Sequence, residues 1–542
     1  NNNNNNNNNN NHNHNHNHSS INNARLESNP AFDSNATPAP APGRPNAGVV
    51  AQSFPAVSEG SDGQALGATS PDDDSLRCAR DLHLQVDPLF TPLWRHPRIH
   101  PIVRYSLPVM VVATILLFMS SNSGAGALVK AAISADGQSV ADLPSVFTFS
   151  LISSIRDMWQ GGVYPLAIVI AMFSGCWPYM KLLLMLGCWF APTRSEKQVE
   201  WRGWVLDLLD MFGKWSLVDT YVLVIFMVAF RFDLSGEHAV SMIVSGIFKE
   251  LGMDAQFTIY IEAALGFYTF LFATVVSLCL GHGMSASHRY ALKILEFGVS
   301  KQGPKARLCN MPVEGVRQGK LYSYGPIAAV SVSLLLVLIG VWLETMEFRF
   351  EGLAGYVLGK EASSRDYSIW TLGVAIPSSA MEPNSLGVRT IQVAFLFFAG
   401  IALPVYLAIL LCLWAAPLSN RKHREFFISC QVLNAWNGTD VFCVSILVSL
   451  LQLRQFAQFI IGGKCDGLNK ILAHLPIAPD IPGAADCFDV RSILRPGLYL
   501  LAISSIIAFV TGLIVLRRCR DALCKGQRDD EASWQPSSPS AA

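Results

Sequence analysis

Eight apolar segments follow residue 100, and each is long enough, or nearly so, to cross a bilayer whose hydrocarbon core is about 30 Å thick. Backbone groups in that core must be hydrogen-bonded within the protein, so we predict that the segments are helices. The hydrophobic share of 51% and the charged share of 15% agree with an all-α polytopic membrane protein. The predicted spans are 105–123, 162–190, 215–232, 259–281, 325–345, 391–415, 437–456 and 497–516.

Basic residues are concentrated in the loops on one side of these spans. If the amino terminus is cytosolic, the cytosolic flanks contain Arg95, Arg194, Arg289, Arg421 and Arg517 among others, and the opposite loops are sparser in basic residues. The positive-inside rule therefore places both termini in the cytosol. Over the whole chain 40 Lys and Arg balance 40 Asp and Glu, so the charge does not indicate a nucleic-acid-binding protein.

Cysteine and histidine give little support for a metal site, and we expect no metal and no cofactor. The 12 cysteines include no Cys-x-x-Cys pair, and most lie in apolar segments. Cys465 and Cys487 share one hydrophilic loop on the predicted outer side, where a disulfide between them depends on the compartment. The Asn-His alternation near the amino terminus is either a weak metal-binding tract or a repeat expansion without a site.

A short polar motif occurs twice. The stretch GKWSLVD at 213–219 opens the third predicted span, and NAWNGTD at 434–440 opens the seventh. Each copy follows two prolines, which are 14 residues apart in the first case and 13 in the second. This order predicts two tandem four-helix modules in parallel orientation. The predicted segments are a disordered low-complexity tail at 1–88, a first module at 89–285, a basic cytosolic linker at 286–322, a second module at 323–520 and a disordered tail at 521–542.

The first module resembles the paraquat-inducible protein A family. The resemblance rests on SGCWPYMKLLLML at 174–186 and LLDMFGKWSLVDTYVLVIFMVAF at 208–230, which match the family's Pro-x-x-Lys helix and its Gly-Lys-Trp-Ser-x-x-Asp helix start. The second module matches only in outline, and together the two cover residues 90 to 525. Bacterial members often add zinc ribbons before each module, and this chain has none.

The two motif copies supply the candidate site. On a helix, positions three or four residues apart share a face, so Trp215, Ser216 and Asp219 would form one polar stripe, which Trp436, Asn437 and Asp440 would repeat. An aspartate inside the hydrocarbon costs roughly 2.5 to 3.5 kcal/mol and therefore usually faces a cavity or a partner. The candidate polar site comprises Lys181, Lys214, Trp215, Ser216, Asp219, Trp436, Asn437 and Asp440.

Plainer interpretations of the same residues stay open. The tryptophans would also suit an aromatic belt at the membrane interface, and Asp219 would also suit a helix cap in headgroup water. Lys181 and Lys214 would also snorkel to the headgroups. Because the second module has leucine and alanine at the equivalent positions 407 and 435, we expect the first module to carry the functional site.

No catalytic triad, carboxylate pair, phosphate-binding loop or metal-ligand spacing is present, so we do not expect an enzyme. The resemblance implies that this protein lies in an inner membrane and acts as a partner of another protein in moving lipid between membranes. We therefore predict a role in lipid trafficking or membrane homeostasis, with membrane lipids as partners and a periplasmic-type partner protein left open. The alternatives are an ion- or proton-coupled carrier of small solutes, in which the carboxylates titrate, and a scaffold without transport.

Overall fold

The computed structural model describes residues 91–135, 138–142, 147–234, 255–292, 307–310, 320–351, 363–451, 453 and 489–532. The predicted tail at 1–88 and the candidate disulfide Cys465–Cys487 lie outside these residues.

The eight predicted membrane-spanning helices are confirmed, and the protein is an integral multi-pass membrane protein. Two spans begin well before the predicted residue, because they include the helices α7 (Glu196–Met211) and α16 (Asn420–Trp436), whose charged side chains lower the local hydropathy. In α7 two of these, Arg202 and Asp210, are buried inside the protein. The spans are Pro101–Ser123, Tyr164–Phe190, Glu196–Ala229, Leu265–Ala291, Tyr322–Trp342, Leu386–Ala415, Asn420–Leu451 and Pro496–Leu523.

The order of elements in the first half of the chain is repeated in the second. Each half has a first long helix, a short helix, a third helix interrupted by a π-helical turn, a broken fourth helix and a long last helix. In the first half these are α3 (Pro101–Ser123), α4 (Leu151–Gln160), α5–η2–α6 (Tyr164–Ile170, Ala171–Cys176, Trp177–Phe190), α7–η3–α8 (Glu196–Met211, Gly213–Leu217, Val218–Ala229) and α10 (Leu265–Ala291). In the second half they are α11 (Lys320–Trp342), α13 (Ile369–Ser379), α14–η5–α15 (Leu386–Phe395, Leu396–Ile401, Ala402–Ala415), α16 (Asn420–Trp436) with helical residues 439–451, and α18 (Pro496–Ala532).

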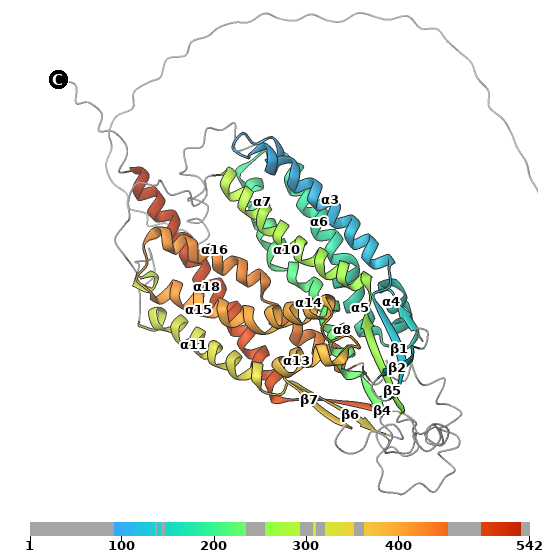
Figure 1. Ribbon diagram of the computed structural model, residues 1–542. Coiled ribbons are helices and arrows are strands. Elements are labelled where there is room, and N and C mark those ends of the chain that lie inside the picture. The colour runs from blue at the N-terminus through green and yellow to red at the C-terminus, as the bar shows by residue number, and fades with distance from the viewer. Residues whose placement is uncertain are drawn as a thin grey trace, which may run out of the picture. The chain divides into compact units, whose positions relative to one another are not determined.

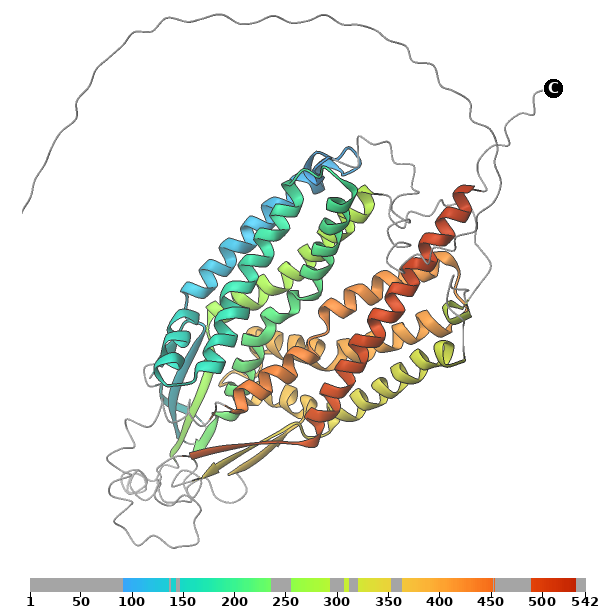
Figure 2. The ribbon, with the colours of Figure 1, turned by 180° about the vertical axis from the view of Figure 1, so that it is seen from behind.

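Two small antiparallel sheets, which were not predicted from the sequence, lie at one end of the helices, here called the sheet end (Figures 1 and 2). The first has the order β2-β1-β5-β4 with β3 also on β1, and the second has the order β7-β6-β8. The predicted helix from 259 therefore starts only at Leu265, because 255–263 pair as a strand. The strands are β1 (Ala127–Ala135), β2 (Gln138–Asp142), β3 (Phe147–Phe149), β4 (Phe232–Leu234), β5 (Ala255–Ala263), β6 (Met346–Glu351), β7 (Ser364–Tyr367) and β8 (Asp489–Leu494). Two 3-10 turns, η1 (Leu93–Arg95) and η4 (Leu308–Asn310), lie at the opposite end, here called the linker end.

The repeat extends to individual backbone contacts. Gly266 N donates to Ala125 O at 2.9 Å in the first half, and Gly497 N donates to Glu344 O at 2.8 Å in the second. These bonds join the start of α10 to the end of α3 and the start of α18 to the end of α11. Each short helix α4 and α13 also begins with a capping box.

The two modules share one large apolar core. Its buried members include Tyr221 of α8, Phe395 of α14 and Phe442 of the helix at 439–451, whose ring centroids lie 5.4 to 5.9 Å apart. At the sheet end, the ring centroids of Phe232 in the first sheet and Phe350 in the second lie 5.0 Å apart. A second core cluster lies inside the first module, around α3, α6, α7 and α10.

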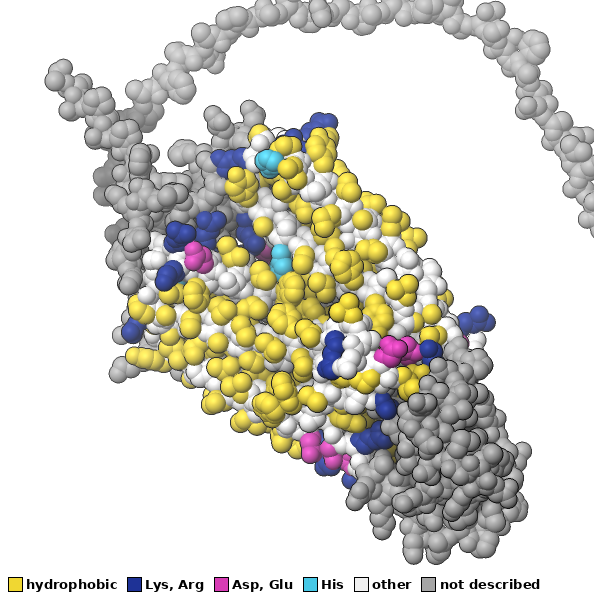
Figure 3. Space-filling model, in the orientation of Figure 1, with side chains coloured by type: hydrophobic (Ala, Val, Ile, Leu, Met, Phe, Trp, Pro, Cys, Tyr) yellow, Lys and Arg dark blue, Asp and Glu magenta, His cyan; other side chains and the backbone are white. Residues whose placement is uncertain are grey.

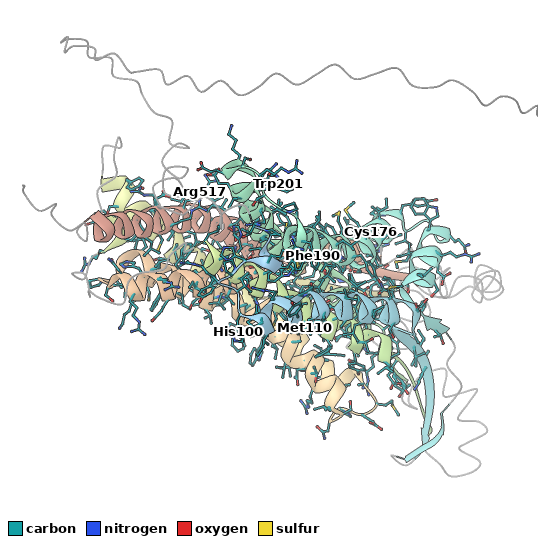
Figure 4. The ribbon with its side chains drawn as sticks, turned by 90° about the horizontal axis from the view of Figure 1, so that it is seen from above. His100, Met110, Cys176, Phe190, Trp201 and Arg517 are labelled. Atoms are coloured by element: carbon teal, nitrogen blue, oxygen red, sulfur yellow. The ribbon has the colours of Figure 1, made fainter. Side chains whose placement is uncertain are left out.

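The outer face of the helices is apolar, as a lipid-facing surface should be. Hydrophobic side chains cover most of the helical surface in Figure 3, and charged side chains gather mainly toward its margins. Exposed Met110 of α3, Phe190 of α6 and Trp201 of α7 are labelled in Figure 4.

The carboxy-terminal boundary differs from the prediction. We predicted disorder over 521–542, but α18 continues to Ala532. Ala522, Leu523 and Lys525 favour helix, so hydrogen bonding propagates past the end of the apolar segment. The linker predicted at 286–322 is likewise shortened, since α10 ends at Ala291 and α11 starts at Lys320.

Candidate functional site

Both copies of the polar motif lie at breaks in the middle of a membrane span. GKWSLVD forms the 3-10 turn η3 (Gly213–Leu217) between α7 and α8, within the span Glu196–Ala229. The second copy breaks the span Asn420–Leu451 at residues 437 and 438, which are not helical. The prediction that these motifs open the third and seventh spans is therefore wrong, although each motif leads into a helix, α8 in the first copy and residues 439–451 in the second. The prediction that each copy forms one polar stripe along a helix is also wrong, because neither copy is a continuous helix.

The two copies meet each other across the module boundary. Lys214 Nζ lies 2.8 Å from Asp440 Oδ2, and the Lys214 side chain is 6% exposed against 34% for Asp440. Gly438 lies beneath the Tyr221 hydroxyl, which keeps the helix at 439–451 close to α8. Lys214, which has no counterpart in the second copy, thus contacts both modules. The polar site is therefore built by both modules rather than by the first alone.

The two motif tryptophans occupy equivalent positions. Trp215 stacks on Phe173 at 4.7 Å between ring centroids, and Trp436 stacks on Phe398 at 5.7 Å. Phe173 and Phe398 lie in the π-helical turns η2 and η5. π-Helical turns are rare and frequently mark functional sites. Neither tryptophan is an interfacial anchor, because both lie inside a span rather than at its end.

Trp436 also takes part in a hydrogen-bonded chain that was not predicted from the sequence. Its Nε1 donates to His282 Nε2 at 2.7 Å, and His282 Nδ1 lies 2.8 Å from Asp210 Oδ2. This geometry fits a neutral imidazole that accepts from the indole and donates to the carboxylate. The chain links α16 of the second module to α10 and α7 of the first. The available signal was weak, because Asp210 lies just before the predicted span 215–232 and His282 directly after the predicted span 259–281.

Lys181 does not snorkel to the headgroups. It is 1% exposed, and its Nζ donates to Ser277 O of α10 at 3.1 Å. Its ammonium group lies directly against Gly213, the first residue of η3. The absence of a side chain at Gly213 leaves the space that this ammonium occupies. Lys181 therefore connects α6 and α10 to the motif turn.

Asp219 faces a cavity rather than headgroup water. It lines a mainly apolar cavity of about 100 Å³ together with Met158, Val222, Phe226 and Phe267, among others. Ten residues separate Asp219 from the end of α8 at Ala229, which at 1.5 Å per residue is about 15 Å. Half of a 30 Å hydrocarbon core is also about 15 Å. Within the described residues Asp219 has no ion pair or side-chain hydrogen bond.

The remaining two candidates have structural surroundings. Asn437 Oδ1 accepts from Thr439 N at 3.1 Å, and Thr439 Oγ1 donates to Ala399 O of η5 at 2.8 Å. Asn437 thus caps the helix that follows the break. Ser216 is buried in η3 at 3% exposure. Over the part of the chain that the structure describes, no cluster of three His, Cys, Asp or Glu side chains suits a metal ion.

Comparisons with known proteins place one motif copy in each of two matching regions. The model of the family described as paraquat-inducible protein A matches residues 144–242 and 389–465. The intermembrane transport protein PqiA of Escherichia coli K12 is 25% identical over 84 residues, which are 15% of this chain and 20% of that protein. The same protein from Shigella flexneri matches to the same extent. The match thus spans about a fifth of these relatives, and no solved structure matches significantly.

Proposed function

We propose that this integral membrane protein takes part in lipid trafficking or membrane homeostasis. Each of its two halves contains a region that matches the model of the paraquat-inducible protein A family. The observation that carries the proposal is the apolar cavity that extends from the sheet end to Asp219, whose carboxylate lies in its wall near mid-membrane depth. An apolar cavity inside a lipid bilayer suits an acyl chain better than it suits a hydrated solute. The relatives named intermembrane transport proteins support the same class of function.

The polar links between the two modules suit a rearrangement of the interface between them. Lys214–Asp440 and the chain Asp210–His282–Trp436 are polar links in surroundings of low dielectric constant, where such links are strong when complete and costly when broken. Both links start from the broken span α7–η3–α8, with Asp210 in α7 and Lys214 in η3, and reach the second module. We infer that lipid passage through the cavity, which lies inside the first module, is accompanied by a change in this contact, and no enzymatic reaction is part of the proposal.

Purification of the full chain in nanodiscs of its own membrane, followed by mass spectrometry of lipids and proteins, tests the proposal. We expect enrichment of specific lipids over the bulk membrane, and a changed set of enriched lipids for Asp219→Leu, which removes the carboxylate from the cavity wall. Asp366→Asn in the second sheet is the matched carboxylate control. If neither lipids nor partner proteins are recovered with the wild-type chain, the lipid-trafficking proposal is wrong.

A proton-coupled carrier is the second candidate, because carboxylates within membrane spans often form proton pathways. Asp219 has no ion pair among the described residues and so is a candidate for proton transfer. In sealed vesicles, a carrier of this kind should show pH-gradient-driven uptake that Asp219→Asn abolishes without loss of folding. If purified Asp219→Asn and Lys181→Ala proteins moved both lipid and solute like the wild type, only the scaffold function would remain.

A further inference from the structure

A second, polar cavity at the sheet end adjoins the apolar cavity of Asp219. We call this second cavity the vestibule; its volume is about 650 Å³, and Ser153, Arg156, Asp157 and Gln160 are among its lining residues. Asn122 of α3 lines both cavities. The cavities are therefore neighbours, one apolar and deep, the other polar and open.

The polar groups around the vestibule differ in their availability to a ligand. Asn122 Nδ2 donates to the Tyr179 hydroxyl at 2.8 Å, which fixes the side chain at the junction. The hydroxyls of Ser150 and Ser153 bond to each other and to the first turn of α4 in its capping box. Arg156 and Asp157 have no ion pair or side-chain hydrogen bond within the described residues. A cation and an anion, adjacent on one helix, thus remain free to bind a ligand.

The aromatic residues next to the vestibule place it at headgroup depth. Trp159, one turn after Arg156 on α4, is 53% exposed, and Tyr164 at the start of α5 is 49% exposed. Their rings contact edge to face, with centroids 5.0 Å apart. Exposed tryptophan and tyrosine at the end of a span gather at the membrane–water interface. A lipid of that leaflet would therefore have its headgroup level with the vestibule and its chains level with the apolar cavity.

We propose that the two cavities form one binding site for a zwitterionic glycerophospholipid. Arg156 binds the phosphate, Asp157 binds the ammonium group, and the end of one acyl chain enters the apolar cavity. The apolar volume of about 100 Å³ is somewhat below the ~150 Å³ of an engineered cavity that holds benzene, so it takes a few methylene groups rather than a whole chain. This inference rests on the proposed lipid function and names its substrate class.

The test uses the full chain in nanodiscs that contain a phosphatidylethanolamine with a photoreactive group near the end of one acyl chain. We expect cross-links to peptides of the apolar cavity, around Met158 and Phe226. Unlabelled phosphatidylethanolamine should compete about fivefold better than phosphatidylglycerol with the same chains, a factor typical of one partly exposed ion pair. Asp157→Asn should remove that preference, and Arg156→Gln should weaken competition by both lipids about fivefold.

Arg194→Gln, an exposed arginine at the linker end, is the control and should compete like the wild type. Cross-links in the cavity with a headgroup preference that neither variant changes would overturn the headgroup assignment. Cross-links found only elsewhere would overturn the site. Because lipid enrichment in native nanodiscs is measured separately, a wrong site with enrichment intact leaves the proposed function standing, whereas loss of both overturns both.

Discussion

At the scale of single residues, the outcome depends on partners that lie far apart in the sequence. Lys214 and Asp440 form an ion pair from two motif copies whose first residues are 221 positions apart by the numbering 213 and 434. Asp219, at the equivalent position in the first copy, faces the apolar cavity instead. The aspartates of the two similar motifs therefore have different electrostatic surroundings, because the lysine of the first motif pairs with the aspartate of the second.

The ion pair predicts energetic coupling between the modules. Lys214→Ala leaves Asp440 without its partner and should lower the free energy of unfolding by about 1–3 kcal/mol. Asp440→Ala should have a similar cost, and the double variant should cost less than the sum of the two. Equilibrium unfolding in mixed micelles measures this cycle, with exposed Lys422→Ala as the control. Strict additivity would contradict the ion pair.

The motif tryptophans provide a matched pair for the hydrogen-bonded chain. Both stack on a phenylalanine, but only Trp436 donates to His282 within the described residues. Trp436→Phe keeps an aromatic ring and loses the N–H, so it should cost about 1 kcal/mol more than Trp215→Phe. The same unfolding measurement compares them. Equal costs would show that the indole N–H of Trp436 contributes no net stability.

At the scale of elements, two glycines fix the packing of equivalent helix pairs. A Cβ on Gly266 would lie 2.5 Å from Ala125 O, and a Cβ on Gly497 would lie 2.5 Å from Glu344 O. Both contacts involve backbone atoms that cannot turn away. Gly266→Ala and Gly497→Ala should therefore each destabilise the protein by about 1–3 kcal/mol.

Gly187 of α6 is the control for this prediction, because nothing lies within 4 Å of its added Cβ. Gly187→Ala should be neutral or stabilise by up to about 1 kcal/mol, since alanine favours helix over glycine. Thermal unfolding of the three purified variants in one detergent gives the comparison. If Gly266→Ala resembled Gly187→Ala, close approach of α3 and α10 would not limit stability.

Glu347 connects the elements of the second sheet and predicts a pH dependence. Although burial favours its neutral form, hydrogen bonds from Arg349 and Ser364 and the charges of Arg349 and Arg495 together hold the pKa of Glu347 below its usual 4.5. Its Oε2 lies 2.6 Å from Arg495 Nη2. A pKa lowered by folding stabilises the protein above the unfolded pKa, and this stability is lost as pH falls through the folded pKa.

Glu347→Gln should therefore lower the melting temperature near neutral pH, and its difference from the wild type should shrink below pH 4.5. Melting curves from pH 7 to pH 3 measure this difference, with Glu425→Gln of an exposed pair as the control. A difference that stayed constant with pH would assign the effect of Glu347 to packing rather than to charge.

How much of these elements the sequence predicts depends on whether the signal is local. The eight spans follow from runs of apolar residues. The early starts of two spans do not, because hydropathy does not take tertiary partners into account: in α7 the buried Asp210 lies 2.8 Å from His282 of α10. The sheets were missed because β1 pairs with β5, whose residues lie more than 100 positions later. Motif residues were found by repetition, but the Lys214–Asp440 contact required the fold.

At the scale of the whole molecule, the shared core makes the two modules one structural unit. Tyr221 of the first module packs on Phe395 and Phe442 of the second. Lys214 and Trp436 each bind across the same boundary. We therefore infer that unfolding of either module exposes apolar surface of the other, and that the two halves unfold together.

The distribution of basic residues over the molecule predicts its orientation. Arg194 and Arg421 lie in or beside loops of a few residues at the linker end, where the positive-inside rule is strongest, and Arg517 lies in the last part of α18. We therefore expect the linker end and the carboxy terminus in the cytosol.

In sealed vesicles with the cytosolic face outward, protease should remove a tag after Ala542 and spare a tag inserted after Pro383, near the sheet end. Detergent should make both accessible. A protected carboxy-terminal tag together with a cleaved tag at Pro383 would reverse the orientation, and the vestibule would then face the cytosolic leaflet.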